Sequence, residues 1–221
     1  MGGRTIDKPA TSCIRDRTVL VTGGFGGIGT ALVAACLEAG AATVVAAGRH
    51  PGPAEGRCVP LALDVADERS VEAVAERWAG EVDIVVNNAG INRSLDLLGR
   101  GAGQAFFEEW SVNALGLMNM VRSFAPPMAA REGSAMVNVL SVLSRRAVPM
   151  LASYCASKAA ALSITESARQ SFPSLRIVNL FPTVVDTPMS AKIAGKKLRP
   201  EDVAAAVLHG LSTGQTDVHF D

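Results

Sequence analysis

Short apolar runs alternate with longer helical patterns along most of this 221-residue chain. The runs are rich in Val, Ile, Leu and Ala and have the length of buried strands. They lie at residues 18–22, 42–47, 58–63, 83–86, 135–140, 175–180 and 217–220. Helical patterns lie between most of them, at residues 28–39, 67–78, 104–124 and 152–171, and from residue 200 onward. Parallel strands need such crossovers, so the alternation predicts an α/β fold with a doubly wound parallel sheet (a Rossmann fold) in a single domain.

Two places depart from the regular alternation. Only residues 50–57 separate the second and third predicted strands, whereas a helical crossover needs about a dozen residues or more. The helix expected there is therefore reduced or absent, which predicts a thin and mobile face of the sheet. Pro126 and Pro127 are predicted to kink or end the long helix that starts near residue 104, because proline lacks the N–H donor.

The composition excludes several classes of function. Acidic and basic residues number 21 each, so no surface for nucleic acid or membrane is predicted. No uninterrupted apolar stretch reaches the roughly 18 residues of a membrane span. The four cysteines form neither a Cys-x-x-Cys pair nor a metal-ligand spacing with the three histidines, which predicts no metal site, no disulfide framework and a cytoplasmic location. Residues 1–16 are expected to form a flexible N-terminal arm, and residues 17–221 the domain.

A tyrosine and a lysine stand four residues apart in the pattern predicted for the helix at 152–171. Tyr154 and Lys158 therefore share one helix face. A free tyrosine has a pKa of about 10 and exchanges protons poorly at neutral pH, whereas a neighbouring ammonium stabilises the phenolate. An isolated pair of this kind is most often an ordinary helix face. Further motifs in the chain give it a chemical meaning.

A glycine-rich segment follows the first predicted strand and opens the next helix. The segment Thr-Gly-Gly-Phe-Gly-Gly-Ile-Gly occupies residues 22–29. Glycines allow a tight turn and a close approach of the backbone to a pyrophosphate, while the helix N-terminus supplies N–H donors. The spacing fits two patterns, because Gly23 and Gly29 combine with either Gly26 or Gly27.

Together these motifs make the chain similar to the short-chain dehydrogenase/reductase family, in its compact single-domain branch, over residues 17–221. Residues 22–29 match the family's TGxxxGxG loop, residues 87–90 its NNAG segment and residues 154–158 its YxASK motif. Asn113 and Ser141 occupy the places of the family's active-site asparagine and serine. Thr183 stands where the family has glycine after proline, which puts the loop beside the nicotinamide in doubt.

The resemblance implies a hydride transfer between a nicotinamide cofactor and a small carbonyl or alcohol substrate. Tyr154 would act as general acid and base, Lys158 would lower its pKa and bind the nicotinamide ribose, and Ser141 would polarise the substrate oxygen. Asn113 would hold a water that links Lys158 to solvent. The implied cofactor contacts are Thr22, Gly23, Phe25, Gly27, Ile28, Gly29, Arg49, Asp64, Val65, Asn88, Ala89, Gly90, Tyr154, Lys158, Pro182, Val184 and Thr187.

The residues after the second strand favour NADP(H), with NAD(H) possible. Enzymes that use NAD place an acidic side chain there for the ribose 2′-hydroxyl, and Gly48 occupies that position. Arg49 follows, and a guanidinium binds phosphate well. Phe25, however, stands where many NADP-preferring relatives carry a basic residue.

Two alternatives remain open: a non-enzymatic NADP(H)-binding sensor on the same fold, and an enzyme like the nucleotide-sugar epimerases and dehydratases. The second is disfavoured because the resemblance would call for an additional C-terminal domain.

The helices bearing Asn113 and Tyr154 carry apolar residues over more than one face, which predicts a homodimer or homotetramer through them. The walls of the substrate pocket are expected at residues 91–98, 142–151 and 184–197.

Overall fold

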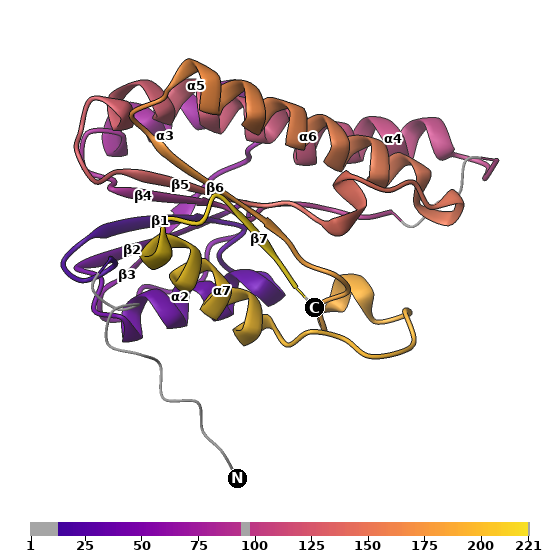
Figure 1. Ribbon diagram of the computed structural model, residues 1–221, viewed down its shortest axis with the longest axis horizontal. Coiled ribbons are helices and arrows are strands. Elements are labelled where there is room, and N and C mark those ends of the chain that lie inside the picture. The colour runs from indigo at the N-terminus through magenta and orange to yellow at the C-terminus, as the bar shows by residue number, and fades with distance from the viewer. Residues whose placement is uncertain (1–12, 94–97, 221) are drawn as a thin grey trace, which may run out of the picture.

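The computed structural model describes residues 13–93 and 98–220, and in this part of the chain seven parallel strands form one sheet (Figure 1). The strand order is β3-β2-β1-β4-β5-β6-β7. The strands are β1 (Thr18–Thr22), β2 (Thr43–Gly48), β3 (Cys58–Ala62), β4 (Ile84–Asn87), β5 (Ala135–Val139), β6 (Arg176–Phe181) and β7 (Asp217–His219). The predicted doubly wound parallel sheet is thus confirmed.

Helices cover both faces of the sheet (Figure 1). On one face lie α2 (Gly27–Glu38) and α7 (Pro200–Thr213), and on the other α3 (Glu68–Trp78), α4 (Ala102–Trp110), α5 (Gly116–Ala129) and α6 (Ala152–Ser171). Successive residues of a strand point to opposite faces, so each strand feeds two cores. In β1, Leu20 packs with α3, α5 and α6, whereas Val19 and Val21 pack with α2 and α7.

The strand order reverses between β1 and β4, and this reversal positions the site. Chain that leaves β1 turns towards one side of the sheet, and chain that leaves β4 turns towards the other. In sheets of this kind, ligands bind in the crevice outside the carboxyl ends of the strands at such a point. Residues that follow β1, β4, β5 and β6 are therefore neighbours.

The connection between β2 and β3 contains no helix, as the short spacing predicted. Residues 49–57 instead make an isolated antiparallel bridge between Glu55 and Cys58. All but the last residue of β3 are half-buried, and that last residue, Ala62, is exposed. This edge of the sheet is accordingly thinner than its centre, where β4 is buried throughout.

The long helix differs from its prediction in two ways. A π-helical turn, η1 (Ser111–Leu115), separates α4 from α5 and carries Asn113. Of the two effects predicted for the prolines, a kink or an end of the helix, the end is wrong, because α5 continues through Pro126 and Pro127 to Ala129. Both prolines are exposed, so the carbonyl groups that lose an N–H partner one turn earlier lie on the solvent side of the helix.

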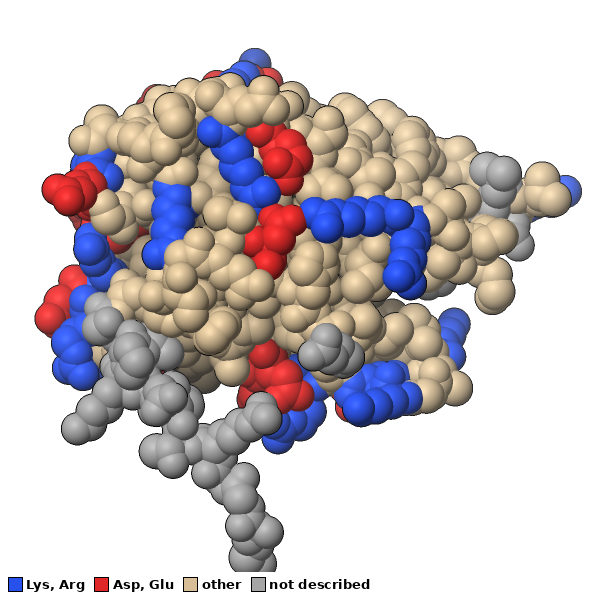
Figure 2. All heavy atoms as spheres, in the orientation of Figure 1, with Lys and Arg blue, Asp and Glu red and all other residues tan. Residues whose placement is uncertain are grey.

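The expected N-terminal arm is described only from residue 13 onward. Residues 1–12 of the expected arm lie outside the described residues, whereas Cys13–Asp16 pack against the domain, with Ile14 fully buried in the core of α2 and α7. Acidic and basic side chains are interspersed on the face that Figure 2 shows. Within the described residues, no helix is long and apolar enough to cross a membrane, and no cluster of side chains suits a metal ion.

Candidate active site

Side chains that follow β1 and β4 lock together at the carboxyl edge of the sheet. Thr22 Oγ1 accepts hydrogen bonds from the backbone N–H groups of Asn88 and Ala89, both at 3.0 Å. The Asn88 amide returns two bonds, to the carbonyls of Thr22 at 3.0 Å and Gly23 at 3.2 Å. The glycine loop and the NNAG segment are therefore one rigid unit.

The glycine loop leaves no room for side chains at two of its positions. A Cβ at Gly29 would lie 1.9 Å from the Gly23 carbonyl oxygen, and one at Gly27 would lie 2.7 Å from Thr187 Cγ2. A Cβ at Gly26 would have a single contact, at 3.4 Å. Of the two glycine spacings that the sequence left open, steric constraints therefore require the one with glycine at position 27. Gly23 has a φ of +64°, which favours glycine.

The same loop presents free backbone donors. The first bond of α2 runs from Thr30 N to Gly26 O at 2.8 Å, so the N–H groups of residues 27–29 precede the helical ladder. Such a helix end attracts anionic groups. With close backbone approach at the glycines, the loop has the shape and the donors that a pyrophosphate needs.

Asn113 ties the segment after β4 to α6. Its Oδ1 accepts from Ile91 N at 2.8 Å, and its Nδ2 donates to Ile91 O and to Ser157 Oγ, both at 2.9 Å. Ser157 Oγ donates in turn to Tyr154 O at 2.8 Å. Both amide protons of Asn113 are thus occupied by protein groups, which leaves only its oxygen for the expected water.

Tyr154, Lys158 and Ser141 converge from α6 and the end of β5. Lys158 is buried, and its Nζ donates to Val139 O at 3.0 Å and lies 6.0 Å from the centre of the Tyr154 ring. Ser141 Oγ accepts from Leu143 N at 3.1 Å, which caps the short helix η2 (Val142–Ser144). A hydrogen bond also joins the side chains of Ser141 and Tyr154.

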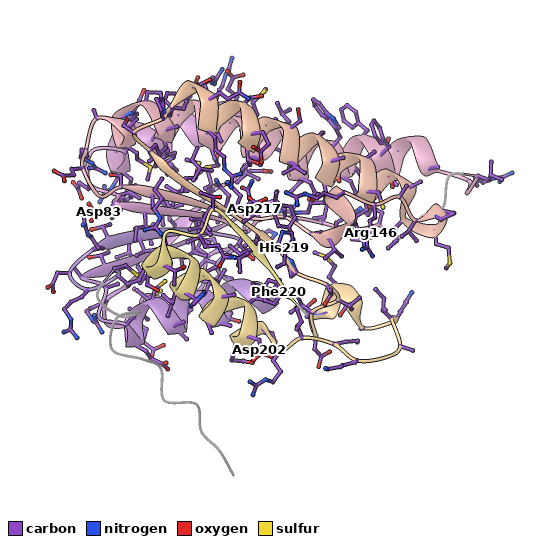
Figure 3. The ribbon with its side chains drawn as sticks, viewed as in Figure 1. Asp83, Arg146, Asp202, Asp217, His219 and Phe220 are labelled. Carbon is purple, nitrogen blue, oxygen red and sulfur yellow. The ribbon has the colours of Figure 1, made fainter. Side chains whose placement is uncertain are left out.

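The segment after Ser141 is anchored to the edge strand. Arg145 donates to Asp217 at 2.5 Å and lies over the ring of Phe181, 4.2 Å from its centre. Phe181 also stacks on His219, with ring centres 4.8 Å apart. Figure 3 shows Asp217 and His219 along β7. The C-terminal strand therefore helps to hold the loop that carries the serine.

Burial sets the acid–base properties of the pair. Burial raises the pKa of Tyr154 to about 12, and the hydrogen bond with Ser141 opposes that rise. Burial lowers the pKa of Lys158 to about 8. The sequence argument expected the lysine to lower the pKa of Tyr154. In this structure the ammonium instead bonds the Val139 carbonyl, and loss of solvation dominates the pKa of the tyrosine.

Comparison with known proteins decides the family. Residues 17–198 match the sequence model described as short chain dehydrogenase. The chain belongs to the short-chain dehydrogenase/reductase family. It is 30% identical to human "Dehydrogenase/reductase SDR family member 11" over 93% of this chain and 92% of the relative. Membership of this family makes the protein a short-chain dehydrogenase/reductase enzyme.

Two solved structures extend the likeness. A short chain dehydrogenase from Burkholderia cenocepacia J2315, in complex with NADP, is 35% identical and has a TM-score of 0.90, over 94% of this chain and 89% of that one. A 3-ketoacyl-(acyl-carrier-protein) reductase from Brucella melitensis, complexed with NADH, is 26% identical and has a TM-score of 0.83, over 94% and 98%.

The other expected contact residues of this short-chain dehydrogenase/reductase lie at the same edge. Asp64 Oδ1 accepts from Ala66 N at 3.0 Å, and Val65 O accepts from Asn119 at 3.0 Å. After β6, Pro182 O accepts from Val142 N and Val184 O from Leu198 N. Residues 94–97 of the expected pocket wall lie outside the described residues.

Arg49 and Phe25 lie where the second strand ends. Arg49 is exposed. The ring of Phe25 covers Gly48 and Gly52, since a Cβ at these glycines would lie 3.3 Å and 3.1 Å from its ring carbons. The aromatic ring thus packs at the carboxyl end of β2, against the segment that connects β2 to β3.

Sequence reasoning missed a row of amides under the site. Asn87 donates to Asn138 Oδ1 at 2.9 Å, Asn138 to Asn179 Oδ1 at 3.0 Å, and Asn179 to Thr165 Oγ1 at 3.0 Å. The three asparagines are buried at matching positions of β4, β5 and β6. The signal was visible, since each is a polar residue inside an otherwise apolar run.

A second omission concerns Glu109 on α4, which has no exposed surface. It stands one turn before Asn113. A charged residue in a helical pattern is ordinarily solvated, whereas here Arg93 N, from a distant segment of the chain, bonds the carboxylate.

Proposed function

We propose that this protein is an NADP(H)-dependent oxidoreductase that interconverts a carbonyl and an alcohol, with Tyr154 as general acid and base. The observation that carries the proposal is the convergence of Ser141, Tyr154 and buried Lys158 at the carboxyl edge of the sheet, where Lys158 Nζ lies 6.0 Å from the centre of the Tyr154 ring. In reduction, Tyr154 gives its hydroxyl proton to the substrate oxygen, which Ser141 polarises. The bound nicotinamide supplies or accepts the hydride.

The cofactor would be held by the edge residues already placed. The free N–H groups of residues 27–29 suit the pyrophosphate, and Asp64 with Val65 lies where an adenine would be contacted. The NADP and NADH complexes of the two solved relatives support a nicotinamide cofactor in the same place. Lys158, beside Gly90 and Tyr154, would reach the ribose.

A small cavity beside Lys158 has a mostly apolar lining with a few polar groups, and these suit a proton relay. Thr22, Asn87, Asn113 and Asn138 contribute to its lining together with the lysine. Asn87 Oδ1 is buried and has no partner among the described residues. A water in this cavity would pass protons between Lys158 and solvent, a role that the sequence assigned to a water on Asn113.

The Tyr154→Phe variant tests the catalytic assignment. It keeps the ring and removes the proton, so cofactor binding should survive while kcat falls by about two orders of magnitude or more. The measurement is turnover of NADPH with a panel of carbonyl compounds, alongside cofactor binding by fluorescence. Near wild-type turnover in this variant would refute the assignment. Tight binding without turnover in the wild type would instead support the cofactor-binding sensor.

Preference for NADP(H) is supported by the absence of an acidic side chain after β2. Gly48 and exposed Arg49 occupy that place, so a 2′-phosphate meets no repulsion there. Gly48→Asp combined with Arg49→Ala should reverse the ratio of kcat/KM values for NADPH and NADH, and Arg49→Ala alone should only weaken it. A wild type that prefers NADH would show that Arg49 serves another purpose.

The setting of the reaction follows from the same observations. The substrate is a small molecule, and the mixed surface charge offers no site for nucleic acid or membrane on the face shown in Figure 2. Cys36, Cys58 and Cys155 are free thiols, which suits a reducing cytoplasm. We further propose that the chain assembles as a homodimer or homotetramer through the helices that carry Asn113 and Tyr154.

A further inference from the structure

A fully buried carboxylate lies on α4, the helix that packs against α6. Glu109 on α4 has 0% exposure, whereas carboxylates are almost never fully buried unless they are paired. Its Oε1 accepts one hydrogen bond, from Arg93 N at 2.5 Å. Its Oε2 has no partner among the described residues. The charge of Arg93 is taken by the neighbouring Glu108, at 2.6 Å, and does not neutralise Glu109.

The packing of the helices places this carboxylate level with the start of α6. One turn after Glu109, Asn113 bonds Ser157, and Ser157 bonds the carbonyl of Tyr154. These bonds fix η1 beside α6, and α4 packs along the same helix. One turn back from the contact between Asn113 and Ser157, the two helices bring Glu109 towards Tyr154.

The groups around Tyr154 differ in charge and in where they point. Ser141 follows β5 and lowers the pKa of Tyr154, Cys155 is its neighbour on α6, and Lys158 directs its ammonium to Val139 O. From α4, which packs against α6, the charged group that acts on Tyr154 is Glu109. After the effect of burial, the negative charge of Glu109 raises the pKa of Tyr154 further, because a carboxylate opposes a phenolate.

We propose that Glu109 is a positioning residue whose buried charge keeps Tyr154 protonated and thereby favours proton donation over proton removal. Through its bond to Arg93 N it also holds the segment after β4, which Asn113 ties to α6. The electrostatic effect on Tyr154 is independent of the proposed function. Its consequence, an enzyme that reduces carbonyl compounds more readily than it oxidises alcohols, rests on the proposed function.

The sequence offers a direct test, because Tyr154 is the only tyrosine among the 221 residues. The ultraviolet difference absorbance of phenolate therefore reports this side chain alone, and Tyr154→Phe supplies the blank. The apoprotein is taken to alkaline pH by rapid mixing, so that the reading precedes unfolding. Circular dichroism under the same conditions verifies that the fold is intact.

The informative variant is Glu109→Gln, which keeps an oxygen for Arg93 N and removes the charge. At a pH well below the midpoint of the titration, where little of the tyrosine is ionised, this variant should show about threefold or more phenolate than the wild type. Such an increase is expected for the loss of one nearby charge in a poorly solvated site. Glu109→Met carries the same expectation should the glutamine variant fail to fold. Glu109→Asp, which retains the charge, and Glu108→Gln, which removes the exposed neighbour, should titrate like the wild type.

Two outcomes would overturn the proposal: identical titrations of Glu109→Gln and wild type, or an equal shift in Glu108→Gln. A second measurement separates the proposal from the proposed function. In Glu109→Gln, the pH profile of kcat for alcohol oxidation should move to lower pH, with a several-fold gain relative to carbonyl reduction. A shifted phenolate titration with an unmoved oxidation profile would refute the role of Tyr154 and with it the directional bias, while the electrostatic effect of Glu109 would stand.

Discussion

Lys158, the proposed partner of Tyr154, carries an unfavourable buried charge. Among the described residues its ammonium has one hydrogen-bond acceptor, Val139 O, and burial lowers its pKa from 10.5 to about 8. Between these two values the unfolded chain binds more protons than the folded protein, so this residue makes stability rise with pH there. Below about pH 8 the lysine is charged in both states, and folding carries the full desolvation penalty.

Replacement of Lys158 by methionine should therefore stabilise the cofactor-free protein while abolishing activity. The free energy of unfolding of the variant should exceed that of the wild type by about 3 kcal/mol more at pH 7 than at pH 10.5. This difference corresponds to the change in the pKa of Lys158 on folding. Urea unfolding of both proteins across this range measures it, with Lys192→Met, an exposed lysine, as the control. A difference that does not depend on pH would mean that the lysine is solvated.

At the scale of single residues, some features of the candidate site could be predicted from the sequence and others could not. Tyr154 and Lys158 were singled out because a spacing of four residues is local and chemically distinctive, whereas Ser141 was assigned through the family resemblance. Glu109 was not, since its burial depends on a segment more than a dozen residues earlier in the chain. The pKa of Tyr154 was expected to fall because the sequence shows the charge of Lys158 but not the loss of solvation around both groups.

At the scale of elements, buried amides connect the central strands. Asn138 in β5 accepts from Asn87 in β4 and donates to Asn179 in β6. Asn138→Leu leaves an amide donor and an acceptor without partners in a buried site, and each such group costs about 1–3 kcal/mol. We expect a loss of about 3 kcal/mol in the free energy of unfolding, measured by urea denaturation.

The control for that measurement is Ser167→Ala on the exposed side of α6. Its hydroxyl bonds only the Ser163 carbonyl one turn earlier, so the change should stay within about 0.5 kcal/mol. An Asn138→Leu variant as stable as the wild type would show that the row of amides contributes no net stabilisation.

Strand and helix positions followed from periodicity, but their irregularities did not. The seven apolar runs predicted the seven strands, because burial on both faces leaves a clear pattern. The π-helical turn at 111–115 has no such pattern, since it serves the placement of Asn113 against Ile91 and Ser157. Pro126 and Pro127 predict a kink or an end of the helix, yet the helix continues, because the effect of proline depends on which side of the helix faces water.

At the scale of the whole molecule, the surface of α4 and α5 is unusually apolar for a solvated helix pair. Phe107 is 66% exposed, Phe106 and Met118 are each 43% exposed, and Trp110 is 38% exposed. Other apolar residues of the helices that bear Asn113 and Tyr154, namely Leu117, Val121 and Ala161, are instead buried in the protein's own core. The case for assembly thus rests on the aromatic side chains of α4 and on Met118.

A homodimer or homotetramer should therefore depend on this aromatic surface. Phe107→Glu places a charge at its most exposed position and should shift the protein to monomer, as measured by light scattering at micromolar concentration. Met150→Glu is the matched control, because Met150 is 72% exposed but lies on the short helix η3 (Pro149–Leu151), away from α4 and α5. The control should keep the wild-type mass. A monomeric wild type would end the idea of assembly, and equal dissociation in both variants would move the interface away from α4.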